Sequence, residues 1–125
     1  MIDRIENWFL SLGATWLTIG MGWGLHMGAS HDFTYAPVHA HLNLVGGVLH
    51  LVFGIAYKLW PNLKARPLLT RIHAYLFMGV TPFFAAGIFL TIKSQSEGLA
   101  VIASILIFAG MAAFCLNAWR ALREA

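Results

Sequence analysis

The sequence predicts an all-α integral membrane protein built as one four-helix transmembrane domain. Of its 125 residues, 59% are hydrophobic and 10% are charged, and the mean hydropathy is +0.72. A soluble domain carries about 25% charged residues. One helical span needs about 20 apolar residues, so this length accommodates four spans with short connections. Four apolar stretches separated by brief polar segments predict spans at 8–29, 37–60, 68–92 and 98–118.

The first span is marked by a stripe of glycines near its far end. Gly20, Gly24 and Gly28 recur every four residues and lie on one helical face. Such small-residue stripes let transmembrane helices approach closely, so we expect this face to pack against another helix. The connection that follows, from 30 to 36, contains His31 and Asp32, which we expect to cap the helix or contact solvent.

Prolines and polar turns indicate where the remaining spans begin and end. Pro37 suits the first turn of a helix, where no amide donor is needed, and Pro61 ends the same span just after 60. The third span carries His73 one turn in, and Pro82 is expected to kink its middle. A polar turn from 93 to 98 precedes the fourth span. Its single cysteine, Cys115, is expected to have a packed structural role.

The basic residues predict the topology. With four spans, both termini and the middle connection share one side of the membrane. That side holds seven of the eight basic residues: Arg4, Lys58, Lys64, Arg66, Arg71, Arg120 and Arg123. Only Lys93 lies on the other side, so the positive-inside rule places both termini in the cytoplasm, with a bacterial inner membrane as the expected location. Because these residues are scattered and share no polar face, no nucleic-acid partner is expected.

Two histidines near the outer end of the second span cannot act on one metal ion together. Each helical residue advances by about 100° and 1.5 Å, so His39 and His41 point roughly 200° apart. Side chains three or four residues apart are the ones that share a face. We therefore expect two sites on opposite faces, with His39, Asn43, Gly46 and His50 on the same one.

A porphyrin fits this arrangement. Imidazole is a normal axial ligand of haem iron, and the macrocycle needs a flat apolar slot between helices. Gly46 and Gly47 are expected to leave room for that slot.

The other histidines could have structural roles instead of binding a metal. His26 could hydrogen-bond a neighbouring carbonyl, and His50, in mid-membrane, must be neutral and paired or else act as a ligand. His73 lies roughly 20 Å in depth from His41 by the helical rise, so it cannot share an iron with that residue. A structural hydrogen bond is therefore the expected role of His73.

The sequence also carries a resemblance to a known family. The run from 27 to 44, MGASHDFTYAPVHAHLNL, resembles the haem-copper oxidase subunit I-like group, and the likeness continues through Arg71-Ile72-His73-Ala74-Tyr75. Subunit I of those oxidases has twelve helices in three arcs of four, and the second helix of each arc carries haem or copper ligands. One of these helices bears a His-x-His pair whose imidazoles ligate two different haems.

The resemblance implies that this chain supplies one arc. A homotrimer would then reproduce the twelve-helix core, with a b-type haem at each subunit interface. That haem would be ligated by His39 of one protomer and His41 of its neighbour. Asn43 would orient a histidine or a haem propionate, and His26 would support the site from outside.

Departures from the family pattern change the activity that we expect, and two alternative functions also fit the sequence. Within the predicted second span no tyrosine lies one turn from His39 or His41, and the third span has no adjacent histidine pair for copper. Oxygen reduction is therefore not expected, and electron transfer with an unnamed redox partner is the predicted role. One rival is a copper- or zinc-binding protein that uses the outer-side residues His26, His31, Asp32, His39 and His41. The other is a cofactor-free assembly protein held together by its glycine stripes.

Overall fold

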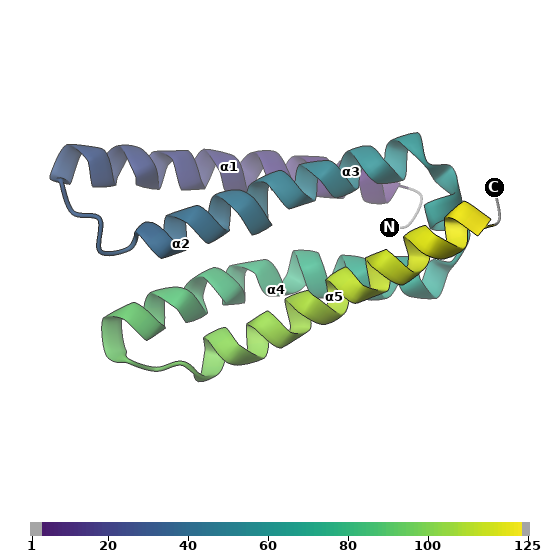
Figure 1. Ribbon diagram of the computed structural model, residues 1–125. Helices are drawn as coiled ribbons and strands as arrows, with labels where there is room; N and C mark the ends of the chain where they lie inside the picture. The colour runs from purple at the N-terminus through teal and green to yellow at the C-terminus, as the bar shows by residue number, and fades with distance from the viewer. Residues whose placement is uncertain (1–3, 124–125) are drawn as a thin grey trace.

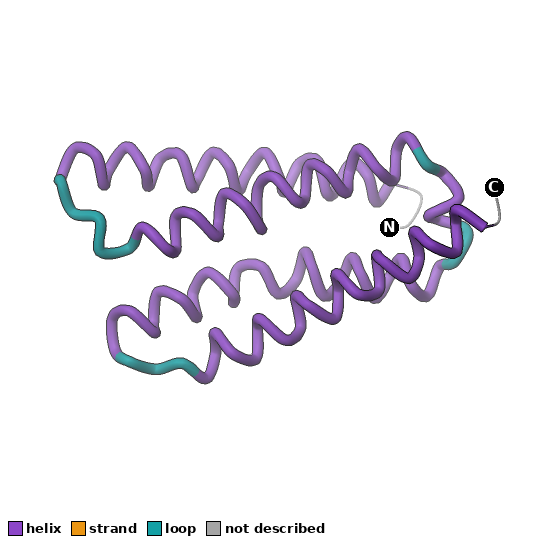
Figure 2. Tube along the Cα trace, viewed as in Figure 1, coloured by secondary structure: helices purple, strands orange, loops and turns teal. Residues whose placement is uncertain are grey.

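The computed structural model describes residues 4–123, which form helices and turns without strands. The α-helices are α1 (Ile5–Ser30), α2 (Ala36–His41), α3 (Leu49–Leu59), α4 (Pro67–Ser94) and α5 (Gly98–Arg123). A π-helical segment, η2 (Leu42–Val48), joins α2 to α3, and a short 3₁₀ turn, η3 (Pro61–Lys64), precedes α4. Because α2, η2 and α3 run on without a break, residues 4–123 form four long helices (Figures 1 and 2). We call the composite one the second long helix.

Three of the four long helices are long and apolar enough to cross a membrane: Ala36–Leu59, Pro67–Ser94 and Gly98–Arg123. Helix α1 has 26 residues, but its glycine, serine and threonine residues dilute its apolar content, and it does not reach the same hydropathy. The observed helices agree with the predicted segments to within a few residues, except that α5 continues past 118 to Arg123. The described residues are thus all-helical, and the chain has the composition of an integral membrane protein.

The long helices pair as two antiparallel hairpins (Figure 1). Helix α1 packs along the second long helix, and α4 packs along α5. Figure 1 places the start of α1 and the end of α5 at the same end of the molecule as the connection between α3 and α4. This is the arrangement that four antiparallel helices require.

Glycines allow each pair of helices to approach closely. A Cβ atom at Gly47 would lie 2.5 Å from Leu17 Cδ2, and one at Gly54 would lie 2.7 Å from Leu10 Cγ. In the other hairpin, a Cβ at Gly87 would lie 2.6 Å from the backbone nitrogen of Ala100. These distances are shorter than van der Waals contact, so only glycine permits the observed spacing.

An aromatic core joins the two hairpins. It comprises Phe9 from α1, Phe53 and Tyr57 from α3, His73 and Phe77 from α4, and Phe114 from α5. The Phe53 ring lies 4.5 Å from the His73 ring, 4.8 Å from Phe77 and 4.7 Å from Phe114, centroid to centroid. Aromatic pairs at such distances are worth about 0.5–1.5 kcal/mol each beyond their area burial. The core therefore fixes one hairpin against the other.

The outer surfaces of α4 and α5 are apolar as well. Only 17% of the most apolar window in each of these helices is buried within the molecule, and large hydrophobic side chains such as Phe83 and Phe108 are exposed. Soluble monomers rarely expose contiguous apolar surface of this extent. Lipid or a partner subunit must cover these faces.

Candidate cofactor-binding groove

His39, near the start of the second long helix, is held against α1 by a backbone carbonyl. Its Nδ1 donates a hydrogen bond to the Gly20 carbonyl oxygen at 2.8 Å. Because a carbonyl can only accept, Nδ1 carries the proton and Nε2 keeps its lone pair. The close approach depends on Gly24, where a Cβ atom would lie 2.8 Å from His39 Cε1. The ring is therefore fixed in the tautomer that a metal ligand needs.

Asn43 lies one turn further along and contacts the same imidazole. Its Nδ2 is 3.2 Å from His39 Nε2 and 3.3 Å from His39 Nδ1; because Nδ1 carries the proton, the amide can donate only to Nε2. Its Oδ1 is buried without a hydrogen-bond partner and lies where a Cβ atom at Gly20 would be. Asn43 thus orients His39, and its amide must give way before a metal binds Nε2.

These two polar side chains face an open groove of about 660 Å³, which we call the His39 groove. The volume falls within the range of about 300–1,000 Å³ that is typical of ligand pockets. One wall is made of small residues from α1, and the remainder is apolar except for the histidine and the asparagine. The lining residues are Met21, Gly24, Leu25, Gly28, Ala29, His39 and Asn43. A flat apolar ligand with a metal centre suits such a lining.

His41 lies on a different side of the second long helix. Its Nδ1 donates to the Pro37 carbonyl oxygen at 2.8 Å, so its Nε2 also keeps a lone pair. The side chain is exposed, and its ring packs edge-to-face on Phe84 of α4 with centroids 5.5 Å apart. His39 thus contacts α1, whereas His41 contacts α4, and the two imidazoles do not share one site within a chain.

Gly46 and Gly47 serve helix packing in this structure rather than leaving an open slot. A Cβ atom at Gly46 would lie 3.0 Å from Trp16 Cβ, and one at Gly47 would meet Leu17. Both glycines are buried. The space that the sequence assigned to a porphyrin is therefore filled by side chains of α1, and the small-residue wall of the His39 groove comes from α1 itself.

His50 and His73 lie in the interior, away from the His39 groove. His50 Nδ1 donates to the Val45 carbonyl oxygen at 2.9 Å, and a 2.9 Å hydrogen bond joins His73 Nδ1 to the Tyr57 hydroxyl. Their rings lie 5.4 Å and 5.0 Å from the Phe9 ring. Neither Nε2 atom has a hydrogen-bond partner within the described part of the chain. The hydrogen bond expected for His73 is thus present, and it uses Tyr57.

The π-helical turns of η2 are a feature that the sequence reasoning missed. They lie directly after His41 and contain Asn43, and the Leu49 amide bonds the Leu44 carbonyl five residues back. A pair of adjacent glycines inside a helix, at 46 and 47, was the available signal. π-turns occur frequently at functional sites. The predicted shared face is nevertheless present, because four residues contact α1: His39, Asn43, Gly46 and His50.

The outer-side residues His26, His31 and Asp32 do not converge on His39 and His41. His31 ends α1 in the left-handed region at φ 55°, and Asp32 Oδ1 accepts hydrogen bonds from Thr34 Oγ1 at 2.6 Å and Thr34 N at 3.0 Å. These two bonds lower the pKa of Asp32 below its ordinary value. Within residues 4–123, no group of three or more His, Cys, Asp or Glu side chains is placed to hold one metal ion. The single chain therefore does not assemble the copper or zinc site that the sequence left open.

Comparisons of the chain with protein-family models, with curated proteins and with solved structures found no match. The likeness of the run 27–44 to the oxidase subunit I-like group therefore stays an expectation from the sequence. Two features of the structure indicate a function, namely the His39 groove and the two imidazoles whose Nδ1 atoms are fixed by backbone carbonyls.

Proposed function

We propose that this protein is a haem b-binding membrane protein that carries electrons. The observation that supports this most strongly is the tautomer of two imidazoles, those of His39 and His41. His39 and His41 each donate Nδ1–H to a carbonyl oxygen at 2.8 Å, which leaves Nε2 available to a metal. Histidines that ligate metals almost always have their other ring nitrogen held in this way. Two imidazoles on one haem iron give a low-spin centre suited to electron transfer.

The His39 groove fits a porphyrin in its chemistry. Its lining is apolar, Gly24 and Gly28 keep one wall flat, and His39 supplies a single imidazole. When bound, the haem supplies one-electron chemistry. The chain would hold the iron through His39, and the exposed side chains of Met21 and Leu25 would cover the ring from water. Asn43 would turn its amide from His39 Nε2 toward a haem propionate.

The second imidazole must come from another copy of the chain. Among the residues that the structure describes, no other histidine lines the His39 groove, and His41 is exposed on the side that faces α4. A head-to-tail contact in which His41 of one protomer enters the His39 groove of the next can close into a ring. Three copies of a four-helix chain would make the twelve-helix arrangement that the oxidase resemblance implies.

This proposal includes α1 as a fourth membrane span, with both termini in the cytoplasm of a bacterium. A 26-residue helix is about 39 Å long, which exceeds the hydrocarbon thickness of about 30 Å. Helix α1 carries Glu6 at its start and no other acidic or basic residue except His26. Close packing of Gly20 and Gly24 against the second long helix compensates for its lower hydropathy.

A complementation experiment tests the shared site directly. His39→Ala and His41→Ala, expressed separately, should each lose the six-coordinate bis-imidazole spectrum. Co-expressed, the two variants can form mixed oligomers in which an intact His39 meets an intact His41 across one interface. Random mixing of equal amounts makes roughly a quarter of the interfaces complete, so the low-spin signal should return to about that extent. A co-expression that restores no signal would mean that the two ligands do not meet across chains.

One further variant separates this pairing from ligation within a chain. Besides His39, the groove lining contains one side chain able to bind haem iron, the thioether of Met21. Met21→Leu should leave the bis-imidazole spectrum intact. If it abolished the low-spin spectrum while His41→Ala did not, both ligands would lie in one protomer. Native mass spectrometry of the haem-loaded protein should give a trimer, and a stable monomer or dimer would contradict the ring.

A further inference from the structure

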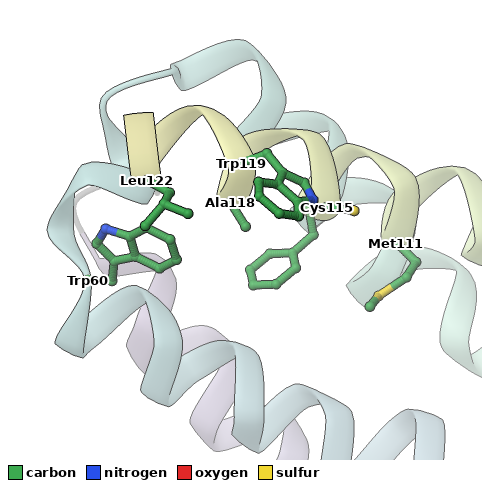
Figure 3. Close-up of a pocket in the computed structure, with 7 residues that line it drawn as sticks. Trp60, Met111, Cys115, Ala118, Trp119 and Leu122 are labelled. Atoms are coloured by element: carbon green, nitrogen blue, oxygen red, sulfur yellow. The ribbon is translucent and has the colours of Figure 1, made fainter. Parts of the chain in front are cut away.

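A second groove lies at the end of the molecule that carries η3, and it faces the outside of the bundle. It has a volume of about 300 Å³ and is lined by Trp60 at the end of α3 and by the last turns of α5. Figure 3 shows Trp60 and Leu122 at one end of this groove and Met111 at the other. We call it the Trp60 groove. Its lining is almost wholly apolar, and Cys115 lies along it, exposed.

Two arginines border the Trp60 groove. Trp119 lines both it and a neighbouring hollow of about 420 Å³, whose other lining residues are Leu116, Arg120 and Arg123. Among residues 4–123, the ion pair is Lys64 with Glu6, and neither arginine has a carboxylate partner. Two exposed arginines therefore adjoin an apolar channel.

We propose that this composite groove seats an anionic diacyl phospholipid. Guanidinium groups bind phosphate through paired hydrogen bonds, and Arg120 and Arg123 lie where a headgroup would be. One acyl chain would run from Leu122 to Met111, eleven residues or about 16 Å along α5. That length matches one leaflet of a hydrocarbon core about 30 Å thick.

Three further observations favour an anionic lipid over other occupants. Trp60 and Trp119 at the mouth are the residue type that lies at membrane interfaces. Basic pockets beside transmembrane helices on the cytoplasmic side attract anionic headgroups. A second copy docked through a two-fold axis would bring Arg120 and Arg123 toward their own equivalents, which is unfavourable. The lipid seat does not depend on haem binding, because it lies at the opposite end from the His39 groove.

Brominated lipids test this seat through tryptophan fluorescence. The protein is placed in nanodiscs of phosphatidylcholine and phosphatidylglycerol at one fixed ratio, with the acyl chains of either one or the other lipid brominated. Because composition and surface charge are identical in the two preparations, only the identity of the lipid beside the tryptophans changes the quenching. Phosphatidylglycerol should be enriched at the seat by roughly five-fold per arginine, and brominated phosphatidylglycerol should therefore quench more strongly.

Two variants and a control localise the effect. Arg120→Gln combined with Arg123→Gln should abolish the excess quenching, as should Trp60→Phe combined with Trp119→Phe. Lys93→Gln, which removes the basic residue at the other end of the molecule, should leave it unchanged. Equal quenching by the two lipids, or an excess that survives loss of both arginines, would overturn the proposal. Absence of quenching of Trp60 and Trp119 by either lipid would also overturn it, because a second protein copy would then cover the groove.

Discussion

Gly24→Ala is the sharpest test of how the chain prepares His39 for a metal. The new Cβ atom would lie 2.8 Å from His39 Cε1, whereas carbon atoms in contact are about 3.5–4.0 Å apart. The imidazole must therefore move by roughly 1 Å. Its 2.8 Å bond to the Gly20 carbonyl would then stretch beyond the usual limit of about 3.2 Å. The substitution leaves His39 in place but releases its orientation.

The effects on stability and on haem binding should differ. Loss of the hydrogen bond costs about 0.5–1.5 kcal/mol, while replacing glycine by alanine within a helix gains about 1 kcal/mol. The free energy of unfolding should therefore change by less than about 1 kcal/mol. Haem affinity should fall about 10- to 100-fold, as it does when the group that orients a metal-binding histidine is removed.

The assay is haem titration of the purified protein, followed at the Soret band, with thermal unfolding measured in the same detergent. Gly22→Ala is the matched control, because it lies on the same helix and a Cβ atom there meets nothing within 4 Å. The control should bind haem like the wild-type protein. Gly24→Ala with wild-type affinity and an unchanged bis-imidazole spectrum would refute the view that the Gly20 carbonyl prepares His39.

Two other perturbations follow from the packing. Gly47→Ala should lower the free energy of unfolding by about 1–3 kcal/mol, since its Cβ atom would overlap Leu17. Gly79→Ala is the control and should not lower it, because a Cβ atom there meets nothing within 4 Å. Equal melting temperatures of the two variants would contradict the close approach of α1. At the start of α1, burial raises the pKa of Glu6, but its backbone hydrogen bond and the 3.2 Å pair with Lys64 together bring it below the ordinary 4.5. Because the folded pKa of Glu6 is depressed, the stabilisation of about 0.2–1 kcal/mol is present above pH 4.5 and is lost as the pH falls through the folded pKa. Glu6→Gln should remove this acid-induced loss of stability. An unchanged acid profile in that variant would contradict the assignment to Glu6.

The helices could be predicted from the sequence because their signals are local. Runs of apolar residues set the helix lengths, and Pro37 and Pro61 mark the limits of the second long helix. The divergence of His39 and His41 followed from helical geometry alone, and the structure places them against α1 and α4 respectively. The face of a helix on which a residue lies depends only on its position along that helix, so it can be predicted from the sequence.

What a residue meets across a helix interface could not be predicted in the same way. Gly46 and Gly47 signalled space, but only the three-dimensional packing shows that Trp16 and Leu17 fill it. The position of the His39 ring also depends on α1, because its Nδ1 donates to the carbonyl oxygen of Gly20. These contacts join residues that are distant in sequence, and no local pattern encodes them.

The proposed binding of haem b through imidazole ligands can be tested directly. The most direct measurement is the absorption spectrum of protein purified from haem-replete cells, before and after reduction with dithionite. A Soret band with sharp α and β bands on reduction, together with one extractable b-type haem per chain, is the predicted result. A colourless preparation that is folded and helical would contradict the claim.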